Sequence, residues 1–447
     1  MKPFAVIALG TCLALSNPAV LTAQTAELTP AQTRSLALQA FKAGQYDITA
    51  QIADALLLRD PNDRIALIMR SRALRALGRP GDAVAPARAA WALSTKDTDR
   101  FIAAMTMAEA LSSDGKRTRA QFWLRRASEL APNDAAKATA INGFKYVKSR
   151  NPLRLSFSGS LAPSSNINNG STATKLGQFT LTGASVALSG VEATLGFSAR
   201  YMLPPSRTQQ TELIFSATGQ SYRLSDKAKV LSPTSKGSDF AYGAVEVGLA
   251  HRRKAGKAGL SFEGALGRNW YGGKPLSDYL KLDAGVQWLL NPRTQAALSV
   301  QGETQKRLDG ANRDTTIVGL TGAVTHILPN QDSLRFSANL RNIQSKATWI
   351  DHRAATLRLD YARAAPIHGI SLSGGINFEA RDYDISPFTA SGRQDRKIGM
   401  TVTAVFNRWD YMGFVPSLEL TAARNDSNIS LYERREFGLS FGIKSAF

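Results

Sequence analysis

The chain has 447 residues and a formal charge of +20, which is enough length for two or three domains. Its basic residues are interleaved with acidic ones, so the charge favours a solvated surface facing anionic lipid or lipopolysaccharide over a nucleic-acid partner. The single cysteine, Cys12, lies in a segment that we expect to be removed. The mature protein therefore has no disulfides and no thiolate metal sites.

Residues 1–23 predict a secretory signal peptide. An apolar stretch runs from Phe4 to Leu15, and cleavage is expected after the small residue Ala23. A lipoprotein cleavage box at Cys12 is the weaker alternative, because Thr11 fits such a box poorly. Beyond the signal there is no run of about 18 apolar residues, so a mature chain that spans a membrane must do so as a closed barrel.

Residues 24–150 predict three helical repeats, each organised around a glycine. The glycines at 44, 78 and 115 lie 34 and 37 residues apart, with a small residue five positions later and a proline or threonine seventeen positions later. This spacing is typical of the tetratricopeptide repeat (TPR), in which glycine permits the inter-helix turn and proline ends the second helix. The repeat positions are Gly44, Tyr46, Thr49 and Pro61, then Gly78, Ala83 and Thr95, then Gly115, Ala120 and Pro132.

Large apolar side chains are expected to form the core of this all-α solenoid. They are Phe41, Leu57, Leu74, Trp91, Met105 and Trp123. Residues 135–149 predict a capping helix, which Asn151-Pro152 ends. Stacked repeats present a concave groove, so we expect a client protein to bind there as an extended or helical segment. A rigid spacer, and an unrelated antiparallel helical array, are the alternatives.

From residue 153 the hydrophobic period becomes two, which is the period of a strand. In residues 191–201 apolar side chains occupy odd positions and polar or small ones even positions. Strands of about ten residues suit a tilted crossing of a bilayer, whereas those of a soluble sandwich are shorter. Residues 151–447 therefore predict an antiparallel transmembrane β-barrel of about 14 strands. The predicted strands are 153–162, 191–202, 210–222, 239–251, 258–269, 279–290, 295–306, 315–328, 333–342, 353–363, 369–381, 397–407, 413–424 and 433–447.

The loop lengths predict how the barrel is oriented. Short connections follow the even strands, and most odd strands are followed by longer polar loops, such as 163–190, 223–238 and 382–396. Outer-membrane barrels have short periplasmic turns and longer external loops. We therefore expect the barrel in the cell outer membrane and the repeats in the periplasm.

The last strand alternates up to a terminal phenylalanine. Its apolar positions are Phe437, Leu439, Phe441, Ile443 and Phe447. This pattern resembles the signal by which the barrel-assembly machinery recognises its substrates, so that machinery is an expected partner.

No motif for catalysis, a metal or a cofactor emerges. Gly438–Gly442 matches G-x-S-x-G, but a serine hydrolase needs that motif on a strand-to-helix turn, and here it falls in a predicted straight strand. The four histidines are scattered without a pair at zinc-binding helical spacing: His251, His326, His352 and His368. We expect a protein that is not an enzyme.

A family resemblance appears at the first predicted strand and its loop. The glycine-bearing strand is followed by Asn166-Ile167-Asn168-Asn169-Gly170-Ser171. With the order of signal, repeats and barrel, this resembles the Slam family, the surface lipoprotein assembly modulators. The resemblance implies an outer-membrane translocon that moves a client, a surface lipoprotein or a secreted protein, from periplasm to cell surface.

The sequence shows no nucleotide-binding site that could power transport. The energy for transport would therefore come from client folding outside the cell or from periplasmic chaperones. A polysaccharide export barrel with a TPR scaffold, and a passive porin-like barrel, are the alternative functions.

Overall fold

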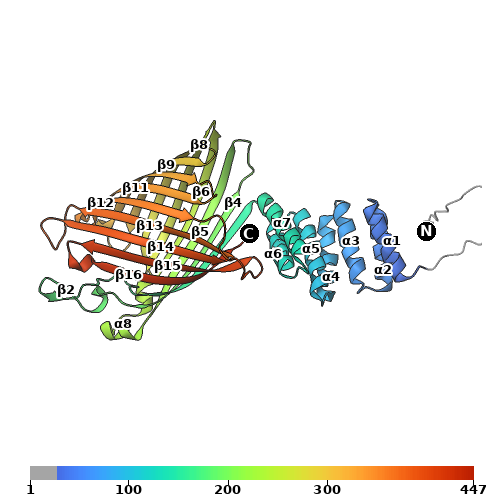
Figure 1. The fold of residues 1–447 in the computed structure, drawn as a ribbon, viewed down its shortest axis with the longest axis horizontal. Coiled ribbons are helices and arrows are strands. Elements are labelled where there is room, and N and C mark those ends of the chain that lie inside the picture. The colour runs from blue at the N-terminus through green and yellow to red at the C-terminus, as the bar shows by residue number, and fades with distance from the viewer. Residues whose placement is uncertain (1–27) are drawn as a thin grey trace, which may run out of the picture. The chain divides into compact units, whose positions relative to one another are not determined.

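The computed structural model describes residues 28–447, so the predicted signal peptide lies outside the described residues. Helices precede strands along the chain (Figure 1), and the chain packs as two compact units that divide after Leu93. The first unit holds α1 (Pro30–Lys42), α2 (Tyr46–Arg59), α3 (Arg64–Ala76) and α4 (Pro80–Leu93). The second holds α5 (Asp97–Ser113), α6 (Arg117–Glu129), α7 (Asp134–Arg150) and all the strands.

None of the helices in residues 28–447 is both long enough and apolar enough to cross a membrane.

The turns inside the repeats are built on glycines with left-handed backbone. Gly44, Gly78 and Gly115 have φ values of 77°, 74° and 75°, which a residue with a side chain rarely adopts. In the first turn the Gln45 amide donates to the Ala40 carbonyl at 2.9 Å, which closes the end of α1. The small residues that follow the glycines are fully buried, so the paired helices approach closely. They are Thr49, Ala83 and Ala120.

The repeat core differs from the expected one. Of the six large side chains expected there, only Leu74 is fully buried, and the other five are half-buried: Phe41, Leu57, Trp91, Met105 and Trp123. Alanines such as Ala37, Ala53 and Ala103 are completely buried instead. Helices that meet on alanine leave no room for large side chains at the contact, so those side chains flank it.

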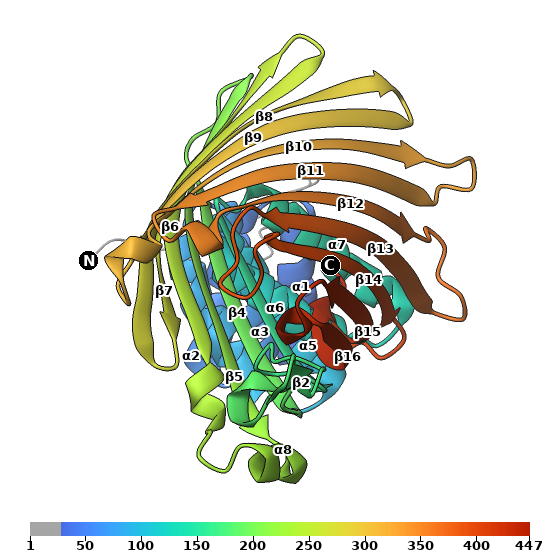
Figure 2. The ribbon, with the colours of Figure 1, turned by 90° about the vertical axis from the view of Figure 1, so that its left-hand side faces the viewer.

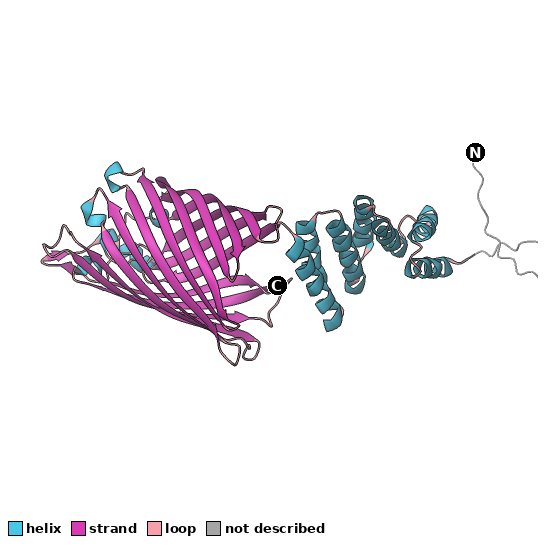
Figure 3. Cartoon of the chain, turned by 90° about the horizontal axis from the view of Figure 1, so that it is seen from above, coloured by secondary structure: helices cyan, strands magenta, loops and turns pink. Residues whose placement is uncertain are grey.

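The second unit contains a closed antiparallel barrel of 14 strands, as predicted, and each predicted strand overlaps an observed one, with ends that differ by up to five residues. The strands run from 11 to 18 residues, so each is long enough for a tilted bilayer crossing of about 9–11 residues. Figure 3 shows them as one continuous wall. They are β1 (Leu153–Ser164), β4 (Gly190–Met202), β5 (Gln209–Leu224), β6 (Tyr242–Ala255), β7 (Ala258–Tyr271), β8 (Lys274–Asn291), β9 (Thr294–Arg307), β10 (Thr315–Ile327), β11 (Ser333–Ser345), β12 (His352–Ala362), β13 (Ile370–Tyr383), β14 (Arg393–Phe406), β15 (Phe414–Ser427) and β16 (Arg434–Ser445).

The two ends of the barrel differ, and we call them the proximal and distal rims. The proximal rim is the end at which β1 begins, and it carries the turns after β4, β6, β8, β10, β12 and β14. The distal rim carries the loops after β1, β5, β7, β9, β11, β13 and β15. Its loops hold the short hairpin β2 (Lys175–Leu176) and β3 (Phe179–Thr180), and α8 (Asp226–Leu231). The loop after β7 is an exception to the expected lengths, because only Gly272 and Gly273 connect β7 to β8.

The two faces of the barrel wall have opposite character, as the alternation predicted. Exposed apolar side chains occur along the strands on one face, among them Phe157, Leu195, Leu282, Ile376 and Phe441. Figure 2 views the barrel from one end. Side chains at the alternate positions face the lumen and carry charges of both signs. There Glu212, 4 % exposed in its side chain, pairs with Arg200 and Arg252 at 3.3 and 2.8 Å. A membrane barrel needs this apolar exterior and polar interior.

Candidate functional site

The ring of strands has one weak position, which is the seam between β1 and β16. Other neighbouring strands pair along most of their length, as β1 does with β4 from Leu153 to Ser164. In the β1–β16 register of the described chain only three residue pairs occur, Ser160 with Gly442, Leu161 with Phe441, and Ser164 with Gly438. Pro163, between the paired residues Leu161 and Ser164, has no N–H to donate to a ladder, and β16 itself ends at Ser445.

The proximal part of β1 therefore lies open on its β16 side. Residues 153–159 pair with β4, but within the described residues they have no partner in the β1–β16 register. Unpaired backbone groups are costly in lipid, and an unpaired strand edge is a place where a barrel can open or accept another strand. We take the seam as the candidate functional site.

Helices α6 and α7 bridge the open part of the seam at the proximal rim. On the β1 side, the Asn151 side-chain amide donates to the Thr118 hydroxyl of α6 at 3.0 Å, and its oxygen accepts from the Leu153 amide at 3.2 Å. On the β16 side, Arg125 of α6 donates to the Ser445 hydroxyl at 2.7 Å and to the Phe447 carbonyl at 3.0 Å. We call these two sets of contacts the helical strap.

Arg125 is the centre of the strap. It also donates to the carbonyls of Met412 and Gly413 at 3.0 Å each, in the turn between β14 and β15. Its guanidinium lies 4.6, 4.4 and 4.8 Å from the ring centroids of Phe144, Phe414 and Phe447. Burial lowers the pKa of Arg125 and nearby Asp410 opposes that change. Arginine stays protonated across the physiological range, so every contact here is charge-assisted.

The distal end of the seam is fastened by the asparagine motif in the loop after β1. The Asn166 side chain both donates to and accepts from the backbone of Gly170, at 2.8 and 2.9 Å. The Asn168 amide donates to the carbonyls of Ala184 and Val186 at 2.8 Å, and its oxygen accepts from the Leu188 amide at 2.8 Å. These bonds join the beginning of the loop to its end.

The same motif ties the loop to its neighbours. Ile167 is 4 % exposed and packs in an apolar cluster with Leu188, Leu224, Ala228 and Phe240, which extends to the loop after β5. Ser171 donates through its hydroxyl to the carbonyl of Ser430, in the loop between β15 and β16, at 2.6 Å. Figure 2 shows β2 next to β16 and α8 beside it at this rim. The motif thus holds the loops on both sides of the seam.

The residues predicted as a barrel-assembly signal occupy two environments. Phe437, Phe441 and Ile443 are exposed on the outer face of β16, and Leu439 is half-buried there. Phe447 lies beyond the strand, where its ring packs edge-on to Phe144 of α7 at 5.0 Å between centroids. Sequence reasoning missed Arg125 and Phe144, because no local pattern marks residues whose partners lie about 300 positions away.

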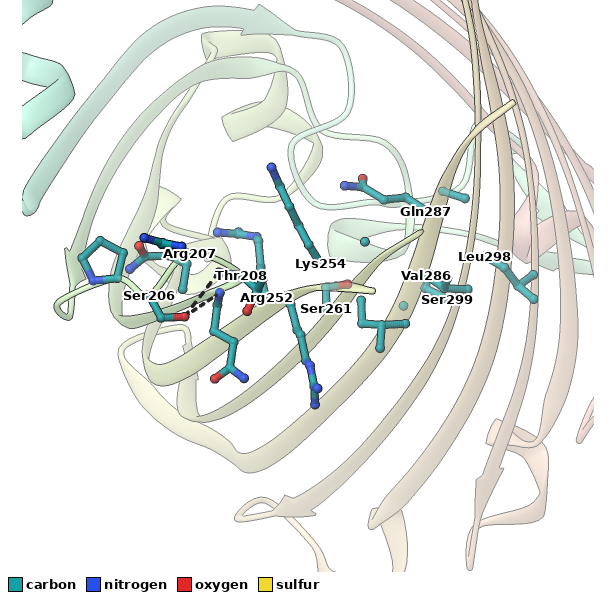
Figure 4. A pocket seen from close by; sticks show the side chains of 18 residues that line it. Ser206, Arg207, Thr208, Arg252, Lys254, Ser261, Val286, Gln287, Leu298 and Ser299 are labelled. Atoms are coloured by element: carbon teal, nitrogen blue, oxygen red, sulfur yellow. Dashed lines mark hydrogen bonds between the residues drawn. The ribbon is translucent and has the colours of Figure 1, made fainter. Parts of the chain in front are cut away.

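The lumen near the proximal rim contains a basic cavity of about 450 Å³. Its lining includes Arg207, Arg252, Arg253 and Lys254 and no carboxylate of the described chain. Figure 4 shows the Arg207, Arg252 and Lys254 side chains on one side of this space, with Gln287 and Ser299 on the other. An anionic segment that enters from this rim would meet favourable potential.

The residues considered for chemistry are not brought together. His251, His326 and His352 lie on β6, β10 and β12, and His368 lies in the turn before β13. Gly438–Gly442 lies inside β16, without the strand-to-helix turn that its motif requires. The described residues hold no cluster of metal-ligating side chains.

A closed barrel with an apolar exterior and a charged lumen defines an outer-membrane β-barrel, here joined to TPR-like helices. The model of the surface lipoprotein assembly modifier family matches residues 154–444, and the chain belongs to this family. Family and fold together point to a transport or assembly protein, and they support an outer-membrane role in lipoprotein assembly.

Comparison with solved structures gives partial likenesses. The type III secretion translocator chaperone SycD of Yersinia enterocolitica is 20 % identical, with a TM-score of 0.25, over 28 % of this chain and 88 % of that one. PcrH of Pseudomonas aeruginosa is 20 % identical, with a TM-score of 0.25, over 28 % and 98 %. A bacterial polysaccharide outer membrane secretin is 9 % identical, with a TM-score of 0.34, over 65 % and 98 %. No curated protein matches the chain.

Proposed function

We propose that this protein is a translocon that moves a client lipoprotein from the periplasm to the cell surface. The observation that carries the proposal is the β1–β16 seam, in which three residue pairs remain and both ends are held by replaceable side-chain contacts. Membership of the lipoprotein assembly family names the class of client.

In this role each part of the chain has its own location in the cell envelope. Residues 1–23 direct export and are removed, residues 24–150 lie in the periplasm, and residues 151–447 form the barrel in the outer membrane, in contact with lipid and lipopolysaccharide. The proximal rim then faces the periplasm. The repeats receive the client through their groove, directly or from a periplasmic chaperone, and the barrel-assembly machinery inserts the chain through the signal that ends at Phe447.

A seam that opens sideways would let a lipid-anchored client cross without moving its acyl chains through the polar lumen. The polypeptide can pass a lumen lined with charged pairs such as Glu246 and Lys281, which lie 3.0 Å apart. An acyl chain cannot do so cheaply, because each CH₂ moved from lipid into water costs about 0.8 kcal/mol. If the seam opens, the polypeptide occupies the lumen while the acyl chains stay in the bilayer.

A disulfide lock of the seam in the full-length chain tests this route. Ser160→Cys with Gly442→Cys joins directly opposed residues of β1 and β16. Ser299→Cys with Thr321→Cys is the matched control, because it joins opposed residues of the fully paired β9 and β10. We expect oxidation of the seam pair to reduce lipoprotein display by at least about tenfold, reduction to restore it, and the control pair to have no effect. Normal display by the oxidised seam variant would exclude opening at the seam.

A further inference from the structure

A second cavity lies in the lumen on the side of the distal rim, between β13–β16 and the loop after β1. Its volume is about 280 Å³, which is room for several water molecules at about 30 Å³ each or for a small hydrated anion. Four cations and two carboxylates line it, so its net charge is 4 − 2 = +2. They are Arg381, Arg393, Lys397 and Arg434, with Asp395 and Glu436.

The strand register brings these groups together. Arg381 of β13 lies directly opposite Asp395 of β14. Lys397 of β14 lies opposite Asn425 of β15, which in turn lies opposite Arg434 of β16. The cavity is therefore built on adjacent rows of four neighbouring strands.

The ion pairs within the cavity leave one cation without a salt bridge. Arg393 pairs with Asp395 at 3.0 Å, and Lys397 pairs with Glu436 at 3.6 Å. Arg381 is taken by Glu379, from the same strand. Within residues 28–447 Arg434 has no salt bridge, and its Nε atom is buried without a hydrogen-bond partner. A buried guanidinium N–H without an acceptor is unfavourable, and an oxyanion is the group that best satisfies it.

Asp395 has the opposite need, because one of its carboxylate oxygens lacks a hydrogen-bond donor. Its residue is 2 % exposed, and its Oδ2 accepts from Arg393 at 3.1 Å. Its Oδ1 is buried and has no partner among the described residues. A buried carboxylate oxygen requires a hydrogen-bond donor. Two residues that line the cavity therefore carry one unpartnered donor and one unpartnered acceptor.

Two features hold the cavity in shape. The Arg393 guanidinium is sandwiched between the rings of Tyr383 and Tyr432, at 3.7 Å from each centroid. Asn169 lines the cavity with a left-handed backbone, at φ 53°, which is uncommon for a residue with a side chain. Asn166 and Asn168 use their side chains to fix the loop, and that loop conformation brings Asn169 to the cavity.

We propose that this cavity binds a phosphate group that carries a hydroxyl, either inorganic phosphate or the phosphomonoester of a lipid. Arg434 Nε donates to a phosphate oxygen, and the phosphate hydroxyl donates to Asp395 Oδ1. Sulfate and phosphodiesters have no such hydroxyl at neutral pH, so they would place an acceptor against the Asp395 carboxylate. The site is a selective one, and it stands independently of the transport role.

Binding of inorganic phosphate to the full-length chain in a neutral detergent tests the proposal, measured by calorimetry at constant ionic strength. We expect phosphate to bind at least about tenfold more tightly than sulfate, and Arg434→Gln to weaken phosphate binding by at least about tenfold. Arg424→Gln is the matched control, because Arg424 is exposed on β15 and pairs with Asp426 outside the cavity. Equal binding of phosphate and sulfate, no phosphate binding at millimolar concentration, or an equal loss in the control would overturn the proposal.

A second variant keeps the test decisive if Arg434→Gln fails to fold. Asp395→Asn replaces the acceptor with an amide that can donate to a sulfate oxygen, so we expect it to narrow or reverse the preference for phosphate. An unchanged preference would contradict the role of Asp395. Folding of each variant is checked by its heat-dependent shift in gel mobility.

Lipid competition then separates the two sources. Micelles containing phosphatidic acid, a phosphomonoester, are compared with micelles containing phosphatidylglycerol, a phosphodiester. Displacement of inorganic phosphate by phosphatidic acid alone supports a lipid headgroup as the ligand, and displacement by neither supports free phosphate. Equal displacement by both lipids would contradict recognition of the hydroxyl.

Discussion

Arg125 and Phe447 are in contact in two ways, although 322 positions separate them. The Arg125 guanidinium donates to the Phe447 carbonyl at 3.0 Å and lies 4.8 Å from the centroid of its ring. Since α7 leads through Asn151 into β1, the helices that hold Phe447 also hold the start of the barrel. At the proximal end the two edges of the seam are thus joined through α6 and α7, whereas their three residue pairs lie further along the strands.

Arg125→Ala should loosen the strap without unfolding the barrel. Each hydrogen bond to a charged group contributes roughly 1.5–3 kcal/mol, and the substitution also removes stacking on three aromatic rings. We expect faster backbone hydrogen exchange in residues 407–413 and 445–447, while β5–β12 keep their protection. Arg119→Ala, an exposed change on the same helix, is the control. Equal exchange in both variants would show that the strap contributes little.

Phe447→Ala separates two roles for that residue. If Phe447 belongs to an assembly signal, its loss should lower the amount of folded barrel in the outer membrane several-fold. Arg125→Ala removes the strap contact of the same residue but leaves the signal, so its barrel level should stay near that of the wild type. Quantitative blotting of heat-modifiable protein measures both variants. Similar levels for Phe447→Ala and the wild type would refute the predicted signal.

Gly170→Ala should disorganise the loop after β1. A Cβ atom at this position would collide with the backbone carbonyl of Val186, which no side-chain rotation can relieve. The overpacking is expected to cost about 1–3 kcal/mol locally, enough to break the bonds from Asn166 and Asn168. Limited proteolysis should then cleave within residues 165–189. Gly322→Ala, which meets no atom within 4 Å, should be as resistant as the wild type, and equal resistance of Gly170→Ala would contradict this packing.

Asp309, in the distal loop after β9, provides a pH-dependent contact. A hydrogen bond from the Arg307 side chain lowers the pKa of this carboxyl from 3.8 to about 2. Because the folded pKa lies below the unfolded one, the stabilisation is complete above pH 4 or so and is lost as the pH falls toward about 2. Asp309→Asn should therefore speed hydrogen exchange in residues 308–314 at pH 5.5 but not at pH 2. A difference of equal size at both values would point to a cause other than this ionisation.

The barrel was predictable because each strand shows the required alternation of apolar and polar residues within its own sequence. Alternation such as that of residues 191–201 fixes which strand positions face lipid, and the turn residues fix where strands end. The turn glycines at 44, 78 and 115 were visible for a similar reason, since a left-handed turn favours one residue type.

The features that depend on distant partners were not predictable. No residue near Arg125 in the sequence indicates that it binds the turn after β14 and Phe447. The unpartnered atoms of Asp395 and Arg434 can be recognised only when the fold has aligned β14 with β16. The prediction of the repeat core was wrong for a related reason. Large residues such as Trp123 were expected inside, but the close approach of the helices gave that place to alanine.

The most direct test of lipoprotein export is a comparison of surface-exposed lipoproteins in cells with and without this gene, by proteolytic shaving of intact cells and mass spectrometry. We expect at least one lipoprotein to disappear from the shaved fraction while it remains in total membranes, and to return when the full-length chain is supplied. The reduced seam variant should restore it and the oxidised one should not. An identical set of shaved lipoproteins in both strains would contradict the account.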